Sequence, residues 1–271
     1  MFDLNALHSS VDGSIFAGKI HLSAVTDSTN SDALAAARED APHGSVWLAD
    51  EQRAGRGRGD HGWESNAGQG LYVSILLRPQ IPVTRLQLLP LAAGLAASEA
   101  IVVTTDRTAD LRWPNDLLLA SRKVGGILVE AKTESLDGEN RIAHAVVGIG
   151  INVHQRAFPA DLATQATSLD LATGRSISRQ ALLLSLLKSL EREALGLMDP
   201  AAAERIPLRL NEASTWMRGR KVEVHGPQAC TGTTAGLDQS GFLRVQTDAG
   251  VVIVQTGGIR DLSSLEAEPK L

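Results

Sequence analysis

The chain has 271 residues, of which 43% are hydrophobic and 21% charged, a composition typical of a globular protein that buries a core. Its formal net charge of −5 argues against a non-specific nucleic-acid binder, which usually carries a basic balance or patch. Cys230 is the only cysteine, which excludes an internal disulfide and a thiolate metal cluster. The first residues lack the basic and apolar regions of a signal peptide, so we expect a cytoplasmic protein.

Short β-rich runs alternate with helical patterns along the first 215 residues. Strands are expected at residues 18–25, 44–51, 70–79, 110–113, 116–120, 124–132 and 142–153. Helices are expected at residues 31–40, 86–104, 178–198 and 200–214. The stretch 86–105 approaches the ~20 residues of a membrane span. However, Gln87, Pro90 and Glu99 favour a buried helix, and we expect no membrane association.

The composition changes near residues 214–218. Residues 219–262 are rich in Gly, Val and Thr, and their strand candidates at 221–226, 230–238, 241–248 and 250–259 are separated by glycine turns. This pattern predicts a small β-barrel of SH3 size. The expected fold class is therefore α+β. A mixed or antiparallel sheet with helices (residues 1–215) is followed by a small SH3-like β-barrel (residues 216–271).

One stretch is unusual: residues 51–65 read EQRAGRGRGDHGWES. Gly57, Gly59 and Gly62 match the dinucleotide-binding pattern G-x-G-x-x-G, but that fingerprint needs a helix at its last glycine, and a strand follows here. Arg-Gly tracts that bind RNA are normally repeated and disordered, whereas this is one stretch between two expected strands. An active-site loop that closes over an anionic ligand fits these residues better than a plain surface loop.

Four further stretches carry polar groups. TDSTNSDA (26–33) places hydroxyls and an amide at a helix start, where they cap the helix or bind a small polar group. In LRWPNDLLL (111–119), the Asn–Asp pair turns the chain, and Asp116 could also hold Mg²⁺ beside phosphates. SRKVGGILVEAK (121–132) puts Lys123 just before a buried strand, and GIGINV (148–153) carries Asn152 in an apolar strand. Taken separately, each stretch is explained about equally well by a structural turn or bulge and by a role in a functional site.

Together, these stretches resemble the ordered motifs of the biotin protein ligases. The family's glycine/arginine signature corresponds to GRGRGDHGW, its Ser-Thr-Asn motif to DSTN, its W-P-N-D motif to RWPND and its lysine motif to RKVGGILVE. GIGINV and the expected C-terminal barrel follow in the family's order. The resemblance extends from about residue 20 to residue 262, and the ordered set is far more specific than any single motif.

The resemblance implies an enzyme that activates biotin with Mg-ATP to biotinyl-5′-AMP. The biotin then passes to a lysine of a biotin carboxyl carrier protein or domain, usually that of acetyl-CoA carboxylase. The implied catalytic residues are Lys123 and Arg58. The implied contacts to biotin and its adenylate are Ser28, Thr29, Asn30, Gln52, Gly55, Arg56, Gly57, Arg58, Trp63, Lys123 and Gly126. The implied ATP and Mg²⁺ contacts are Arg112, Asn115, Asp116 and Asn152, with Asp116 as the candidate metal ligand.

The chemistry of the first step suits these residues. The biotin carboxylate attacks the α-phosphate of ATP, and because both are anions, fixed cations such as Lys123, Arg56 and Arg58 must screen their repulsion. The product is a mixed anhydride that water hydrolyses readily. We therefore expect the Gly/Arg stretch to close over it and exclude water until the acceptor docks.

Two departures from the family pattern matter. Arg112 stands where the family often has lysine, which keeps the charge but changes the hydrogen-bond geometry. Repressor-type members carry an N-terminal winged-helix domain, and only 26 residues precede Asp27, so we expect no DNA binding. Either a monomer or a homodimer is compatible with the sequence. A lipoate or octanoate ligase on the same fold is the nearest alternative, and a nucleic-acid-binding module is a more distant one.

Overall fold

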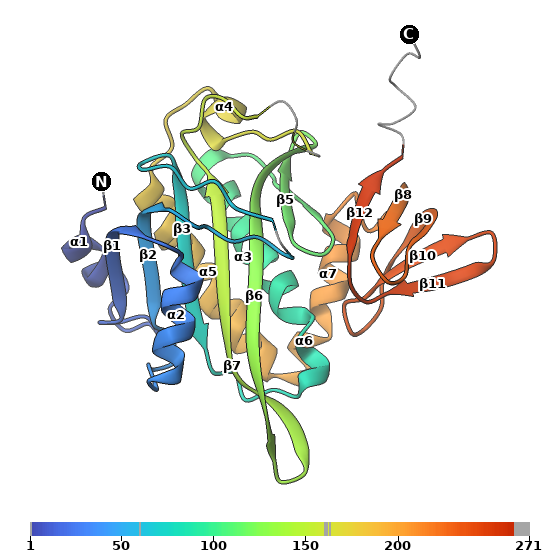
Figure 1. Cartoon of the computed structure of the whole chain (residues 1–271), viewed down its shortest axis with the longest axis horizontal. Coiled ribbons are helices and arrows are strands. Elements are labelled where there is room, and N and C mark those ends of the chain that lie inside the picture. The colour runs from blue at the N-terminus through green and yellow to red at the C-terminus, as the bar shows by residue number, and fades with distance from the viewer. Residues whose placement is uncertain (1, 60, 160–161, 163, 263–271) are drawn as a thin grey trace.

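The computed structural model describes residues 2–59, 61–159, 162 and 164–262. Two β-sheets dominate it, and Figure 1 shows the smaller C-terminal sheet beside one edge of the larger sheet. The larger sheet has seven strands in the order β1-β2-β3-β7-β6-β5-β4. These are β1 (Ile20–Thr26), β2 (Val46–Gln52), β3 (Gly70–Leu77), β4 (Asp110–Arg112), β5 (Asp116–Leu119), β6 (Arg122–Leu136) and β7 (Glu139–Asn152). Only the β1–β2 pair is parallel among these recorded pairings, so the predicted mixed sheet with helices is confirmed.

Helices cover both faces of this sheet. The helical segments are α1 (Leu4–Ser10), α2 (Thr29–Arg38), the 3-10 turn η1 (Val83–Arg85), α3 (Leu88–Thr105), α4 (Leu169–Thr173), α5 (Arg179–Met198), α6 (Pro200–Ala203) and α7 (Arg205–Ala213). Helix α2 packs Ala33 and Ala37 on Leu76 and Val146 of one face. Helices α3 and α5 contribute to the main core on the other face. Because both faces are covered, every residue of β3 is buried, which explains why all its residues but Ser74 and Tyr72 are apolar or glycine.

The apolar segment considered as a membrane span lies inside the protein. Residues Val83–Thr105 are long and apolar enough to cross a membrane by length and composition alone. Most of α3 is nevertheless buried, and its small residues allow close packing: Gly94 sits so near Leu111 that an added Cβ would lie 1.9 Å from Leu111 Cδ1. The expectation of a buried core helix is confirmed.

Two regions differ from their expected bounds for local reasons. The helix expected at 200–214 divides at Glu204 because Pro207 has no N–H, and its ring would clash with the carbonyl of Ala203 one turn earlier. The strands expected at 124–132 and 142–153 extend into one long hairpin, β6–β7, which projects below the sheet in Figure 1. Its turn uses Asp137 and Gly138, both with positive φ, and this Asp-Gly pair is a sequence signal for a tight hairpin.

The C-terminal sheet is antiparallel, in the order β11-β10-β9-β8-β12. Its strands are β8 (Arg218–His225), β9 (Cys230–Leu237), β10 (Leu243–Thr247), β11 (Gly250–Val254) and β12 (Gly258–Asp261). The strand expected at 250–259 is therefore two strands that lie at opposite ends of the sheet. Because no pairing joins β11 to β12 within the described residues, closure into the predicted SH3-like barrel is not confirmed. Trp113 links the two sheets by donating from Nε1 to the Gly241 carbonyl at 3.1 Å.

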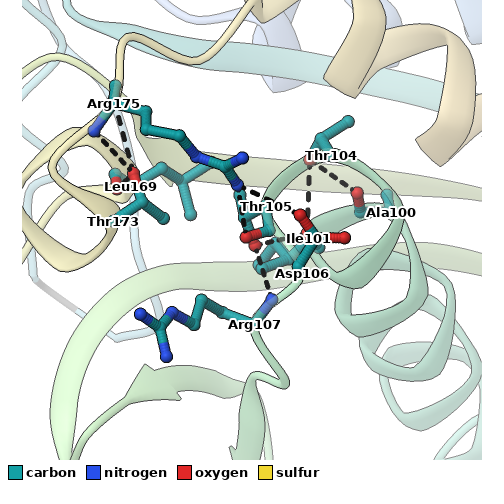
Figure 2. A network of polar contacts seen from close by, with 9 residues as sticks. All are labelled: Ala100, Ile101, Thr104, Thr105, Asp106, Arg107, Leu169, Thr173 and Arg175. Atoms are coloured by element: carbon teal, nitrogen blue, oxygen red, sulfur yellow. Dashed lines mark hydrogen bonds and ion pairs between the residues drawn. The ribbon is translucent and has the colours of Figure 1, made fainter.

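A polar network fixes the end of α3 to the segment after α4 (Figure 2). The α3 C-cap, Asp106, adopts the left-handed conformation, which leaves the carbonyl of Thr105 accessible. Arg175 donates from Nη2 to that carbonyl at 2.7 Å and to Asp106 Oδ2 at 3.3 Å. A cation at this position also interacts favourably with the helix dipole. The side chain of Arg107 points away from the network in Figure 2, and only its backbone N–H donates to Thr105 Oγ1.

We expect Arg175→Gln to lower the free energy of unfolding by about 1 kcal/mol, because it removes the cation that binds the Thr105 carbonyl at the end of α3. Arg107→Gln is the matched control, since it also removes one arginine beside the same helix end. Urea denaturation of both variants measures the difference. Equal stability of the two variants would show that the Arg175 contact contributes nothing.

Candidate active site

A cavity of about 650 Å³ opens on the face of the large sheet that also carries α2, and the C-terminal sheet forms one section of its wall. Most of the residues singled out in the sequence line it: Ser28, Thr29, Asn30, Gln52, Arg56, Gly57, Arg58, Trp63, Arg112, Asn115, Asp116, Lys123 and Gly126. The C-terminal sheet and its loops add the segment 256–260 together with His225 and Pro227. Stretches far apart in the chain thus form one site.

Strand pairing explains why the motifs meet. The parallel strands β1 and β2 end side by side, with Thr26 opposite Gln52, so the DSTN stretch and the Gly/Arg stretch leave the same edge of the sheet. Farther across, register aligns Asp116 with Gly126, Gly126 with Gly150, and Gly150 with Tyr72. Since side chains alternate between the two faces of a strand, these aligned positions share the face that carries the cavity.

Two of the proposed site residues do not line this cavity. Gly55 lies at the base of the Gly/Arg stretch, where an added Cβ would meet the Trp63 carbonyl at 2.4 Å. Asn152 is buried and donates from Nδ2 to the carbonyl of Thr167 at 3.1 Å. The amide of Thr167 in turn donates to the Lys123 carbonyl at 2.9 Å. Asn152 therefore supports the strand-like segment that lies beside Lys123.

One end of the cavity is a chain of neutral polar groups. Gln52 accepts from the Thr29 backbone N–H at 2.9 Å through Oε1 and donates through Nε2 to Ser65 at 2.8 Å. The hydroxyl of Ser74 lies 2.7 Å from Thr29 Oγ1 and 2.5 Å from Asn30 Oδ1. Thr29, Asn30 and Ser74 are all buried. This end can therefore donate to and accept from a small polar group without any water between them.

Glycines make room for the side chains that lie on the sheet. A Cβ at Gly148 would be 2.0 Å from Asn30 Oδ1, and one at Gly150 would be 2.6 Å from Nε1 of Trp63. A Cβ at Gly126 would be 3.3 Å from the Trp63 ring. These three glycines let Asn30 and Trp63 lie directly against the strand backbones.

The other end of the cavity is cationic. Asp116 Oδ1 pairs with Lys123 Nζ at 2.6 Å, and Asp116 Oδ2 pairs with Arg112 Nη2 at 2.5 Å. Burial alone would raise the pKa of Asp116, but the charges and hydrogen bonds of Lys123 and Arg112 outweigh it and hold this pKa below its usual value. The carboxylate is thus ionised at neutral pH, and the three side chains together carry one net positive charge.

Arg58 adds a second cation. It donates from Nη1 to the Gly257 carbonyl at 2.8 Å and approaches Asn115 Oδ1 at 3.4 Å, so both of these partners are neutral oxygens. Burial lowers the pKa of the Arg58 guanidinium, which Asp116 partly offsets, but an arginine remains charged in proteins. Lys123 Nζ also lies over the Trp63 ring, 5.5 Å from its centroid.

The described residues 53–59 and 61–63, which we call the Gly/Arg loop, form the two sides of a small hairpin over the cavity. Its two sides pair through Gly57 N–H to the His61 carbonyl at 2.7 Å and Trp63 N–H to the Gly55 carbonyl at 2.8 Å. Arg58, near the tip, reaches the C-terminal sheet. Such a loop covers a ligand and excludes water from it.

The donor set does not fit Asp116 as a magnesium ligand. Both of its oxygens already face cations. Across the residues that the structure describes, no group of three or more His, Cys, Asp or Glu side chains is placed to share a metal ion. A divalent cation at this site would depend on ligands that a substrate brings, such as phosphate oxygens.

Sequence reasoning missed three contributors. Ser74 is a polar residue in an otherwise apolar strand, and that interruption was a usable signal. Glu130 contacts both Asn30 and Arg56. The segment 256–258 of the C-terminal sheet lines the cavity, but its sequence contains no motif that predicts a functional site.

Comparison with known proteins agrees with this architecture. A family model described as the biotin/lipoate A/B protein ligase family matches residues 22–152. The bifunctional ligase/repressor BirA of Bacillus spizizenii is 33% identical over 243 residues, covering 87% of this chain and 71% of that protein. A protein of Mycobacterium tuberculosis named biotin–[acetyl-CoA-carboxylase] ligase is 31% identical and covers 87% of this chain and 86% of its own length.

A solved structure is similar over nearly the same range. The biotin protein ligase from Aquifex aeolicus in complex with biotin and ATP aligns with a TM-score of 0.75 and 29% identity, covering 90% of this chain and 98% of that one. The shared fold, the matched family model and a relative 33% identical over most of both proteins lead to one conclusion: the chain belongs to the biotin/lipoate A/B protein ligase family.

Proposed function

We propose that the protein is a biotin protein ligase. It converts biotin and ATP into biotinyl-5′-AMP and pyrophosphate, and then transfers the biotinyl group to a lysine of a biotin carboxyl carrier protein or domain, such as that of acetyl-CoA carboxylase. Support comes from the Aquifex aeolicus relative, which binds biotin and ATP, and from the name of the Mycobacterium tuberculosis relative. The proposed place of action is the cytoplasm, and the proposed unit is a catalytic domain of residues 1–215 together with a C-terminal domain of residues 216–271.

One observation carries the choice of substrate: the cavity has a neutral hydrogen-bonding end and a cationic end. The ureido ring of biotin offers both N–H donors and a carbonyl acceptor, which suit Asn30, Thr29 and Ser74. The dithiolane ring of lipoate offers neither, so it would form no hydrogen bonds with these groups, a loss of about 0.5–1.5 kcal/mol for each bond that biotin makes. The carboxylate at the far end of biotin then faces Lys123 and Arg58.

In the first step, a carboxylate oxygen of biotin forms a bond to the α-phosphorus of ATP, and the bond from that phosphorus to the bridging oxygen of pyrophosphate breaks. Lys123 and Arg58 offset the repulsion between the two anions. Asp116 holds Lys123 and Arg112 in position through its two ion pairs. Mg²⁺, when present, would neutralise charge on the phosphates that hold it. We assign it no protein carboxylate.

In the second step, the neutral amine of the acceptor lysine attacks the acyl carbon, and AMP leaves as a stabilised anion. The attacking nitrogen gives up a proton to solvent. No covalent intermediate with the enzyme is needed. The Gly/Arg loop delays hydrolysis of the mixed anhydride by covering the cavity until the acceptor arrives.

The direct test is incubation with α-labelled ATP and either biotin or lipoate, followed by separation of the adenylates. We expect biotinyl-AMP, and transfer of biotin to a carrier domain when one is added. Formation of lipoyl-AMP without biotinyl-AMP would replace the proposed substrate. Salt-sensitive binding to an oligonucleotide with no response to biotin would instead favour the nucleic-acid alternative.

Lys123→Ala is expected to slow adenylate formation by about 100-fold or more, because it removes a fixed cation from the reacting anions. Single-turnover formation of biotinyl-AMP measures this directly. Lys132→Ala, an exposed lysine farther along β6, is the matched control and should retain the wild-type rate. An unchanged rate in Lys123→Ala would remove Lys123 from the catalytic role.

Gly148→Ala is expected to raise the KM for biotin about 10- to 100-fold, because its new Cβ displaces Asn30 and breaks the neutral polar chain. The KM for ATP should change little, since Gly148 lies at the neutral end. Gly196→Ala in α5, where an added Cβ meets only Ala202 at 3.8 Å, controls for a glycine substitution elsewhere. Equal rises in both KM values would contradict the assignment of the two ends.

A further inference from the structure

Glu130 joins the neutral end of the cavity to the Gly/Arg loop. Its carboxylate accepts from Asn30 Nδ2 at 2.9 Å, and it binds Arg56 through Nη1 at 3.0 Å and Nη2 at 2.5 Å. Asn30 is buried at the start of α2, whereas Arg56 belongs to the loop that covers the site. One carboxylate on β6 therefore holds two segments that are separate in the chain.

This contact differs from an ordinary surface salt bridge. Exposed ion pairs typically contribute little, because solvent screens the charges and both side chains lose freedom. Here the pair is bidentate, the Glu130 side chain is only 28% exposed, and a buried amide fixes one of its oxygens. Glu130 also lines a smaller cavity of about 400 Å³, together with Gly55, Gly57 and Gly62 of the loop.

The other attachments of the loop are of a different kind. Its base is held by the bridge between Gln52 and Ser65, its inner side by Trp63 packed on the sheet, and its tip by Arg58 on the Gly257 carbonyl. Glycines separate these points, and a glycine backbone resists rotation poorly. The ion pair between Arg56 and Glu130 holds the glycine-rich side of the hairpin against β6.

The ion pair also changes the role of Arg56. Because Glu130 balances its charge, Arg56 is not a free cation for the phosphates, in contrast to Arg58. A ligand that binds Asn30 would contact the same side-chain amide that donates to Glu130 and orients its carboxylate. Occupancy of the neutral end and the position of the loop are thus linked through one carboxylate.

We propose that Glu130 is a positioning residue that holds the Gly/Arg loop closed over the acyl-adenylate and sets how long the adenylate stays bound. The proposal rests on the proposed ligase function. Loss of the ion pair leaves the reacting cations Lys123 and Arg58 in place, so adenylate formation depends on Glu130 much less than adenylate retention does.

The test is Glu130→Gln, which keeps the size of the side chain and an acceptor for Asn30 but removes the charge that binds Arg56. We expect biotinyl-AMP to dissociate about 10-fold faster in a chase experiment, with a matching rise in biotin transfer to the lysines of serum albumin. Single-turnover adenylate formation should change less than about 3-fold by the same scale. Glu134→Gln, farther along β6 and exposed, is the control and should match the wild type.

A second measurement needs no activity. Trypsin should cut the Gly/Arg loop at Arg53 or Arg58 faster in both Glu130→Gln and Arg56→Gln than in the wild type, while thermal unfolding reports whether each variant is folded. If Glu130 acts through Arg56, the double variant should release the adenylate no faster than the faster single variant. Should Glu130→Gln not fold, Arg56→Gln alone carries the proteolysis test.

The proposal would be overturned if the folded single variants released the adenylate and were cleaved in the loop at wild-type rates. It would also be overturned if the double variant released the adenylate faster by the product of the two single-variant factors. Failure of the wild-type protein to form biotinyl-AMP would overturn the ligase function instead. In that case the trypsin measurement still decides whether Glu130 holds the loop.

Discussion

The absence of side chains at Gly148 and Gly150 is the constraint on which the rest of the site depends. A methyl group at either position would collide with Asn30 or with Trp63. Asn30 belongs to the neutral polar end, and Trp63 closes the Gly/Arg loop on the sheet. Both functions therefore require bare backbone at neighbouring positions of one strand face. The alternation of glycine and isoleucine in GIGIN supplies this face while Ile149 and Ile151 enter the core behind it.

The charges of the site are arranged by the same sheet. Register sets Asp116 beside Gly126, one strand away from the glycine face, so Lys123 and Arg112 meet over a surface without bulky side chains. A lone buried carboxylate would be costly, and the two cations without it would repel each other. The cluster resolves both problems and leaves one net positive charge, to which Arg58 adds another. This net positive charge suits a cavity that, under the proposed function, binds the anions biotin and ATP and then releases pyrophosphate.

The core elements and many of the residues that line the cavity were predictable from the sequence, because both depend on local patterns. Apolar runs marked β3 and α3, and the ordered motifs marked many of the residues that line the cavity. Contacts between distant segments were not predictable: Glu130 lies in an ordinary strand pattern, and its significance depends on two partners 74 and 100 residues away. Sheet closure had the same difficulty. Short strands divided by glycine suggested a barrel, yet the break between β11 and β12 places them at opposite edges of the C-terminal sheet.

The C-terminal sheet belongs to the site rather than being an appendage. Trp113 donates to Gly241, and Arg58 donates to Gly257, so the large sheet and its loop supply the donors and the C-terminal sheet supplies the carbonyl partners. An added Cβ at Gly257 would lie 1.9 Å from the His225 carbonyl, so this turn packs closely on β8. Arg58, near the tip of the loop, thus contacts a backbone carbonyl of the C-terminal sheet through one N–H, whereas the side of the loop rests on the Glu130 ion pair. The bidentate ion pair is the stronger of the two contacts, so its loss would free the side of the loop while Arg58 at the tip keeps its carbonyl partner.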